Sequence, residues 1–242
     1  MLILNNGAPK SGTTWIQSIL RSVPEVIFPD PKWQNGNKNP SIARDRISEY
    51  FQSDEWRKNN VLVKMHEKYD DDLSFIADPE IRVVITYRNL PDSVVSWYHH
   101  QLRLGKTTAD QKNDWLESEG RRYCIRIISQ RLSWIDKPNT LLMRYEDMIA
   151  DPATKIFDLL AFCGLPVSHK IASEMAQKTR KGPSSADKLR EGKHVRTGGI
   201  SVASTELPAE FLKSLLDLED LVSSGTFDEK VSSHFLNDRV LL

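Results

Sequence analysis

A short stretch near the N-terminus has the residue types of a phosphate-binding loop. It runs from Gly7 to Trp15 with the sequence GAPKSGTTW. Lys10 brings a full positive charge, and hydroxyl donors at positions 11, 13 and 14 suit the oxygens of a phosphate-like group. Glycines at 7 and 12 allow the backbone to turn tightly and to approach a ligand closely. These donors around two glycines predict an anion site rather than an ordinary turn.

The elements on either side of this loop determine where its donors point. The apolar run Leu2 to Leu4 precedes it, and Ile16, Ile19 and Leu20 follow it at helical spacing. The loop is therefore predicted to join a buried strand to a helix. Such a junction aims backbone N–H groups and the positive end of the helix at one point, which favours an anion there.

The position of the lysine separates this loop from the common nucleotide-hydrolase loop. That loop reads G-x-x-x-x-G-K-[ST], with the lysine directly after the second glycine. Here Lys10 precedes Gly12, and Thr13 follows it. A P-loop kinase that uses ATP and Mg²⁺ would also need an acidic residue at a strand end. The kinase is the alternative enzyme, and a non-catalytic nucleotide-binding module is a third possibility.

Three further apolar segments, residues 61–66, 82–88 and 140–145, read as buried strands that alternate with helices. This alternation predicts one α/β domain over residues 1–242. Its expected architecture has three layers, with a central parallel sheet of about five strands flanked by helices, similar to the P-loop NTPases. In such a sheet, ligands bind at the carboxyl ends of the strands. Residues at four predicted strand ends are expected to meet there: Lys10, His66, Arg88 and Tyr145.

Arg88 and Ser96 form a second candidate anion site. Ser96 lies eight residues after Arg88, about two turns into the helix predicted to start near Pro91. A guanidinium and a hydroxyl that converge there suit a second phosphate. The alternative is that Arg88 pairs with Asp92 and that Ser96 has no role. These residues alone leave both interpretations open.

Composition narrows the class of protein. The 242 residues include 33 Lys and Arg and 33 Asp and Glu, so the net charge is zero and favours neither nucleic acid nor a membrane surface as partner. The two cysteines suggest no disulfide framework and fit a reducing compartment. No apolar run reaches the length of a membrane span. A soluble cytoplasmic protein is expected, and no cluster of residues has metal-ligand spacing.

The motifs together resemble those of the sulfotransferases that use 3′-phosphoadenosine 5′-phosphosulfate (PAPS). The sequence PKSGTTW is similar to their 5′-phosphosulfate loop, and Arg88 to His99 is similar to their 3′-phosphate motif. Tyr145-Glu146-Asp147, followed by Asp151-Pro152, resembles a further family motif. Residues 196–198 resemble the R-K-G element that closes over the 3′-phosphate, with Thr197 in place of the usual lysine. The motifs occur in family order between residues 7 and 199.

The resemblance assigns a role to each motif. It implies that the loop residues Lys10, Ser11, Gly12, Thr13, Thr14 and Trp15 bind the 5′-phosphosulfate, with Trp15 against the adenine. It implies that the 3′-phosphate is bound by Arg88, Ser96, Arg196, Thr197 and Gly198. Tyr145 would contact the adenine. PAPS is thus the expected co-substrate, its product is 3′-phosphoadenosine 5′-phosphate (PAP), and no metal is required.

The resemblance also implies in-line transfer of a sulfuryl group to a hydroxyl or amine of a small-molecule acceptor. His66 is the expected general base, and Glu67 is the rival base. Lys10 would stabilise the leaving oxygen, and Lys64 the sulfuryl oxygens. The acceptor site is expected in residues 28–33, 103–122 and 181–194, which do not identify the acceptor. The usual dimer segment of the family is not found after Gly199, so the oligomeric state stays open.

Overall fold

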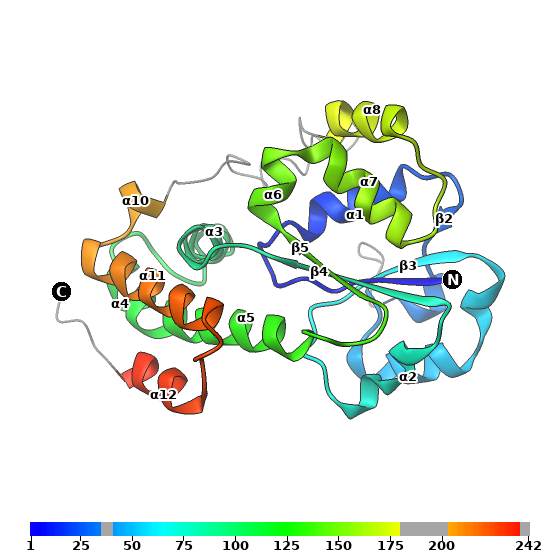
Figure 1. Ribbon diagram of the computed structural model, residues 1–242. Coiled ribbons are helices and arrows are strands. Elements are labelled where there is room, and N and C mark those ends of the chain that lie inside the picture. Colours follow the sequence, from blue (N-terminus) through cyan, green and yellow to red (C-terminus); the bar gives the residue numbers. More distant parts are fainter. Residues whose placement is uncertain (35–40, 180–202, 238–242) are drawn as a thin grey trace. The chain divides into compact units, whose positions relative to one another are not determined.

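The structure, a computed structural model, describes residues 1–34, 41–179 and 203–237. Its contacts divide these residues into two compact units (Figure 1). The first unit holds residues 1–87 and 130–179, and the second holds residues 88–129 and 203–237. The expectation of one domain over residues 1–242 stays a prediction.

A five-stranded parallel sheet forms the centre of the first unit. Its strand order is β2-β3-β1-β4-β5, and every pairing is parallel. The strands are β1 (Leu2–Asn5), β2 (Val26–Ile27), β3 (Asn60–Lys64), β4 (Ile81–Tyr87) and β5 (Thr140–Arg144). The predicted parallel α/β sheet is confirmed. The proline and asparagine content of residues 24–40 predicts a loop, but Val26–Ile27 within it forms the two-residue strand β2.

Alternate residues of each strand enter two different cores. Leu2 and Leu4 pack on one face of the sheet, and Ile3 packs on the other. The first face is covered by α2 (Arg44–Gln52) and by Trp134. The second face is covered by α1 (Thr13–Arg21), α7 (Pro152–Phe162) and α8 (His169–Thr179) (Figure 1). Burial on both faces explains why these strands are almost continuously apolar.

Several local elements differ from the expected ones. The amphipathic pattern of residues 41–56 predicts a single helix, but the structure has two elements there, α2 and the 3₁₀ helix Glu55–Lys58, because Asp54 takes a left-handed conformation with φ 55°. The acidic residues at the start of residues 70–77 predict a helix there, and the structure has the 3₁₀ helix Asp71–Ala77. A further 3₁₀ turn spans Pro31–Trp33. Tyr145, expected as a strand residue, is the first residue of α6 (Tyr145–Ala150).

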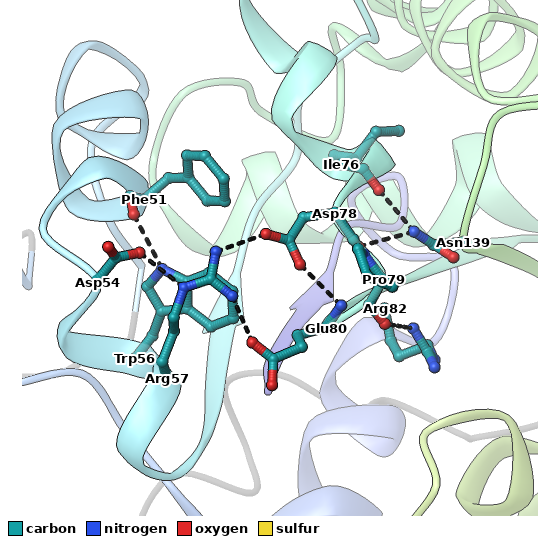
Figure 2. A network of polar contacts seen from close by, with 10 residues as sticks. All are labelled: Phe51, Asp54, Trp56, Arg57, Ile76, Asp78, Pro79, Glu80, Arg82 and Asn139. Carbon is teal, nitrogen blue, oxygen red and sulfur yellow. Dashed lines mark hydrogen bonds and ion pairs between the residues drawn. The ribbon is translucent and has the colours of Figure 1, made fainter.

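Polar contacts fix the amino-terminal edge of the sheet (Figure 2). Arg57 forms ion pairs with Asp54 at 2.8 Å, with Asp78 at 2.6 Å and with Glu80. The side-chain amide of Asn139 donates to the carbonyls of Ile76 and Asp78, each at 2.9 Å. These bonds hold the turns before β4 and β5, at the edge opposite the predicted ligand site.

The second unit is helical in its described residues. Its elements are α3 (Leu90–Arg103), α4 (Lys112–Trp115), a π-helix (Leu116–Gly120), the start of α5 (Arg121–Ser133), α10 (Ala203–Glu206), α11 (Ala209–Ser223) and α12 (Glu229–Asn237). Arg121, 1% exposed, donates to Glu117 at 2.7 Å and to the Phe235 carbonyl at 2.9 Å. The polar composition of segment 103–122 predicts a surface stretch with one short helical patch, and the structure has α4 and the π-helix there.

Two further features bear on the predicted class. Cys124 and Cys163 are buried free thiols. Within the described ranges, none of the helices combines the length and apolar character needed to cross a bilayer.

Candidate phosphate site and its neighbours

The loop between β1 and α1 has the strained backbone of a ligand-binding turn. Lys10 has φ 69° and Gly12 has φ 104°, so two of three successive residues are left-handed. The left-handed region is costly for a lysine, and non-glycine residues held there are concentrated at functional sites. Gly12 is also required by its neighbour, because a Cβ there would lie 2.8 Å from the Tyr145 ring.

Ser11 and Thr86 join the loop to the end of β4. The Ser11 hydroxyl, 1% exposed, lies 2.6 Å from the Ala8 carbonyl, 2.8 Å from the Thr86 carbonyl and 2.9 Å from the Thr86 hydroxyl. Gly7 permits this approach, because a Cβ there would meet the Thr86 hydroxyl oxygen at 1.8 Å. In this structure Ser11 therefore holds the loop in place, and its role toward a ligand stays a prediction.

Helix α1 begins without a side-chain cap. Its N-cap is Gly12, which has no side chain to accept a hydrogen bond from the first turn, and that turn contains no acidic residue. Thr14 is exposed there, whereas Thr13 is 4% exposed. An uncapped helix N-terminus next to Lys10 attracts an anion through both its N–H groups and its dipole.

His66 lies beside the loop in a defined tautomer. Its Nδ1 atom is 2.6 Å from the Gly7 carbonyl oxygen. Since a carbonyl only accepts, Nδ1 carries the hydrogen, and Nε2 of the neutral ring is the proton acceptor. The residue as a whole is exposed. Sequence reasoning predicted the position of His66, but not the carbonyl that orients it.

Two more predicted residues lie at the carboxyl edge of this sheet. Lys64 ends β3, and burial lowers the pKa of its ammonium group. Tyr145 follows β5, is 8% exposed, and makes an edge-to-face contact with Trp15 at 6.4 Å between ring centroids. Trp15 in turn donates through Nε1 to the Thr179 hydroxyl at 2.9 Å. The aromatic pair forms a wall next to Gly12. Sequence reasoning missed Thr179.

The other predicted phosphate ligands belong to the second unit. Arg88 lies 3.5 Å from the Asp92 carboxylate, which is 2% exposed. The Asp92 side chain also accepts from the Asn89 amide at 3.1 Å and from the Ala203 N–H at 3.3 Å. The Arg88–Asp92 pair, one of the two interpretations left open by the sequence, is therefore present. Ser96 is half-buried on α3. Arg196, Thr197 and Gly198 lie outside the described residues.

A cavity of about 550 Å³ is also present in the second unit. Trp97 and Tyr123 stack in its wall with ring centroids 5.2 Å apart, and the Arg126 guanidinium lies 5.6 Å from each ring. Residues of the predicted acceptor segment 103–122 line it too, among them Trp115 and Arg122. The aromatic faces and cations suit a flat, polar or anionic group.

No group of three or more His, Cys, Asp or Glu side chains in the described ranges has the arrangement of a metal site. Lys64, Tyr87 and Arg144 end the three longer strands β3, β4 and β5. A P-loop kinase would place an acidic residue at such a position, to hold Mg²⁺.

Comparison with known proteins places these features in a family. Residues 3–206 match the family described as the sulfotransferase domain. A flavonol 3-sulfotransferase of Flaveria bidentis is 24% identical over 177 residues, which are 67% of this chain and 56% of that protein. Sulfotransferase 1A1 of Bos taurus is 26% identical over 186 residues, 71% of this chain and 61% of that protein. The chain thus matches less than two thirds of the length of these relatives.

A solved structure has the same fold. Mouse sulfotransferase SULT7A1, complexed with PAP, superposes with a TM-score of 0.64 at 17% identity, over 97% of this chain and 87% of that chain. At this identity the likeness concerns the arrangement of strands and helices. It confirms the P-loop-like α/β fold expected from the sequence.

Proposed function

Because this chain belongs to the sulfotransferase domain family, we propose that it transfers a sulfuryl group from PAPS to a hydroxyl or amine of a small-molecule acceptor. The observation that carries this proposal is the combination of an uncapped helix N-terminus, the left-handed Lys10 and the oriented His66 at one edge of the sheet. The PAP complex of the mouse neighbour and the flavonol named for the plant relative also support it.

The proposed step is an in-line displacement at sulfur. The acceptor oxygen forms a bond to sulfur while the bond from sulfur to the 5′-phosphate oxygen breaks, which yields the sulfated acceptor and PAP. The acceptor proton moves to Nε2 of His66, and its Nδ1–H stays bonded to the Gly7 carbonyl. Negative charge grows on the leaving oxygen, so Lys10 and the N–H groups at the start of α1 stabilise the transition state more than the ground state.

The half-buried Lys64 is proposed to neutralise the sulfuryl oxygens. Its burial lowers its pKa because the ammonium loses water. An anion bound next to it would favour the charged form again, so ligand binding and Lys64 protonation would reinforce each other. Ser11, Thr13, Thr14, Trp15 and Tyr145 complete the proposed 5′-phosphosulfate and adenine contacts.

The 3′-phosphate is proposed to bind Arg88 and Ser96, joined by Arg196, Thr197 and Gly198. A phosphate that binds the Arg88 guanidinium would compete with Asp92, whose carboxylate keeps its bonds from Asn89 and Ala203.

The cytoplasm is the proposed location. The cavity with the stacked Trp97 and Tyr123 favours a flat acceptor ring.

Two measurements test the proposal. We expect PAP to raise the melting temperature more than ATP with Mg²⁺ does, and stronger stabilisation by ATP with Mg²⁺ would favour a kinase instead. We also expect ³⁵S from labelled PAPS to appear on an acceptor from a panel of phenols, alcohols and amines. PAP binding without any transfer across that panel would indicate a non-catalytic nucleotide-binding module.

Paired variants separate the two candidate bases. His66→Ala is expected to reduce turnover by about 10²–10⁴-fold, the usual contribution of a general base. Glu67→Gln is expected to reduce it much less. Near-normal turnover in His66→Ala, with a large loss in Glu67→Gln, would move the base to Glu67.

A further inference from the structure

Three consecutive residues, from the end of β1 to the start of the loop, each hold one residue of the segment that carries His66. The Asn5 carbonyl accepts from the Met65 N–H at 3.0 Å. The Asn6 side chain accepts from the Glu67 N–H at 2.7 Å and donates to the Glu67 carbonyl at 3.0 Å. The Gly7 carbonyl accepts from His66 Nδ1 at 2.6 Å. The histidine is therefore held through its ring and through both neighbouring residues.

Beyond the last paired residues of β1 and β3, the Asn6 side chain connects the two segments. The register between β1 and β3 ends with Asn5 opposite Lys64. The Asn6 backbone N–H donates to Val84 of β4 at 2.9 Å. Its side-chain amide, with one donor edge and one acceptor edge like a peptide group, bonds to Glu67 instead. Asn6 is fully buried and Glu67 is half-buried, so the Asn6 ends of both bonds are shielded from water.

We propose that Asn6 is a positioning residue, which fixes the backbone at Glu67 so that His66 keeps Nδ1–H on the Gly7 carbonyl and Nε2 toward the acceptor. This inference rests on the proposed function only in its catalytic part. Gly7 opens the phosphate-binding loop and Asn6 directly precedes it, so the same residues would set the distance between the base and the bound phosphosulfate.

Trp134 provides a second, weaker support at the same point. Its indole N–H donates to the Glu67 carbonyl at 2.9 Å, so that oxygen accepts from both Trp134 and Asn6. The Glu67 N–H is bonded to Asn6. Loss of Asn6 therefore removes two bonds and loss of the Trp134 N–H removes one, which ranks the expected effects of the two substitutions.

The test compares Asn6→Leu, Trp134→Phe and a control variant, Asn139→Ala. Leucine is close to asparagine in shape but forms no hydrogen bond. Asn139 also holds backbone carbonyls through its amide and has φ 52°, but it lies at the opposite edge of the sheet (Figure 2). Its substitution lowers stability without touching the His66 segment.

The first readout is independent of activity. The ¹⁵N signals of the His66 ring at pH 8, assigned by their loss in His66→Gln, report which nitrogen carries the hydrogen. We expect one tautomer, with hydrogen on Nδ1, in the unmodified protein and in Asn139→Ala, and a mixture of tautomers in Asn6→Leu. Unchanged ring signals in Asn6→Leu would overturn the positional claim, whether or not the protein transfers sulfuryl groups.

The second readout is kinetic. Asn6→Leu is expected to lower kcat by about 10- to 100-fold, the scale of a misplaced catalytic group, with the KM for PAPS changed by less than about threefold. Trp134→Phe is expected to lower kcat by about two- to fivefold, as loss of one of two donors would. Altered ring signals with unchanged kcat would overturn the catalytic part. If Asn6→Leu does not fold, Trp134→Phe decides with the same two readouts.

Discussion

Lys10 combines two properties at one residue, a positive charge and a left-handed backbone with φ 69°. Only glycine adopts this conformation without a steric cost, so a lysine here sacrifices stability for its place in the loop. Natural proteins tolerate such local strain mainly where function requires it. The charge and the strain can be separated by two substitutions at this one position.

Lys10→Ala removes the charge and keeps the strain, whereas Lys10→Gly removes both. We expect both variants to lose turnover by about 10²–10³-fold, as expected when a group that stabilises the leaving oxygen is removed. In urea denaturation, the free energy of unfolding of Lys10→Gly should be about 1 kcal/mol higher than that of Lys10→Ala, because glycine adopts the left-handed conformation without strain. Equal turnover in the unmodified and the Gly variants would show that the lysine charge does not act in the reaction.

Lys64 gives a prediction with a defined pH dependence. Burial lowers the pKa of its ammonium group below the ordinary value of 10.5. The folded state therefore carries a desolvation penalty at every pH below the folded-state pKa, and the penalty disappears as the pH rises toward and above 10.5.

Lys64→Met should remove that penalty. We expect the ligand-free variant to melt a few degrees higher than the unmodified protein at pH 7, with the difference shrinking as the pH approaches 10.5. Its turnover should fall, because the proposed partner of the sulfuryl oxygens is lost. Melting curves from pH 7 to 10 measure the first effect. A variant that melts lower at pH 7 would mean that packing or partners of Lys64 outweigh the desolvation of its charge.

At the scale of elements, the close contact between the loop and β4 depends on Gly7. Gly7→Ala is expected to destabilise the protein by about 1–3 kcal/mol, the usual cost of overpacking, because the new methyl group would overlap the Thr86 hydroxyl. Adding Thr86→Ala should recover part of this loss, although Thr13 Cγ2 also lies 2.6 Å from the Cβ position.

Urea unfolding of the two single variants and the double variant measures this coupling. Gly120→Ala serves as the control, because its Cβ would meet its nearest neighbours at 3.4 Å, an ordinary contact distance. Strictly additive effects of Gly7→Ala and Thr86→Ala would contradict the contact.

The strands and the residues at their ends could be predicted from sequence because each depends on local pattern. Burial on both faces makes β1, β3, β4 and β5 apolar, so their boundaries were predicted within about two residues. The residues that support the site depend on strand register instead. Thr86 meets Ser11 across 75 positions, and Asn6 meets Glu67 across 61. No local pattern encodes such pairings, so the contacts of Thr86 with Ser11 and of Asn6 with Glu67 were missed.

Short and irregular elements were missed for a related reason. Strand β2 has two residues, and its pairing with β3 rather than its own composition makes it a strand. The π-helix Leu116–Gly120 has a polar sequence that resembles a loop, and its place between α4 and α5 makes it helical. In both cases tertiary contacts outweigh local propensity.

For the whole molecule, net charge says little about the ligand. Equal numbers of acidic and basic residues give zero net charge, yet Lys10, Lys64 and the start of α1 lie along one edge of the sheet. Local clusters of this kind bind anions in neutral proteins. The proposed ligand carries a second phosphate, assigned to Arg88 and Ser96 in the second unit, and this assignment can be tested through the ligand itself.

PAP and AMP differ only in the 3′-phosphate, so their difference in affinity measures what that phosphate contributes. We expect PAP to bind about 10- to 100-fold more tightly than AMP, since a hydrogen bond between charged groups contributes about 1.5–3 kcal/mol.

Arg88→Ala alone would leave the Asp92 carboxylate buried without its guanidinium, and the resulting instability would obscure the measurement. The variant to use is therefore Arg88→Ala with Asp92→Asn, and Asp92→Asn alone is its control. Calorimetric titration should show that the double variant loses most of the preference for PAP while its affinity for AMP stays within about threefold. If the double variant keeps the full preference, the 3′-phosphate binds elsewhere, and Arg88 serves only to pair with Asp92.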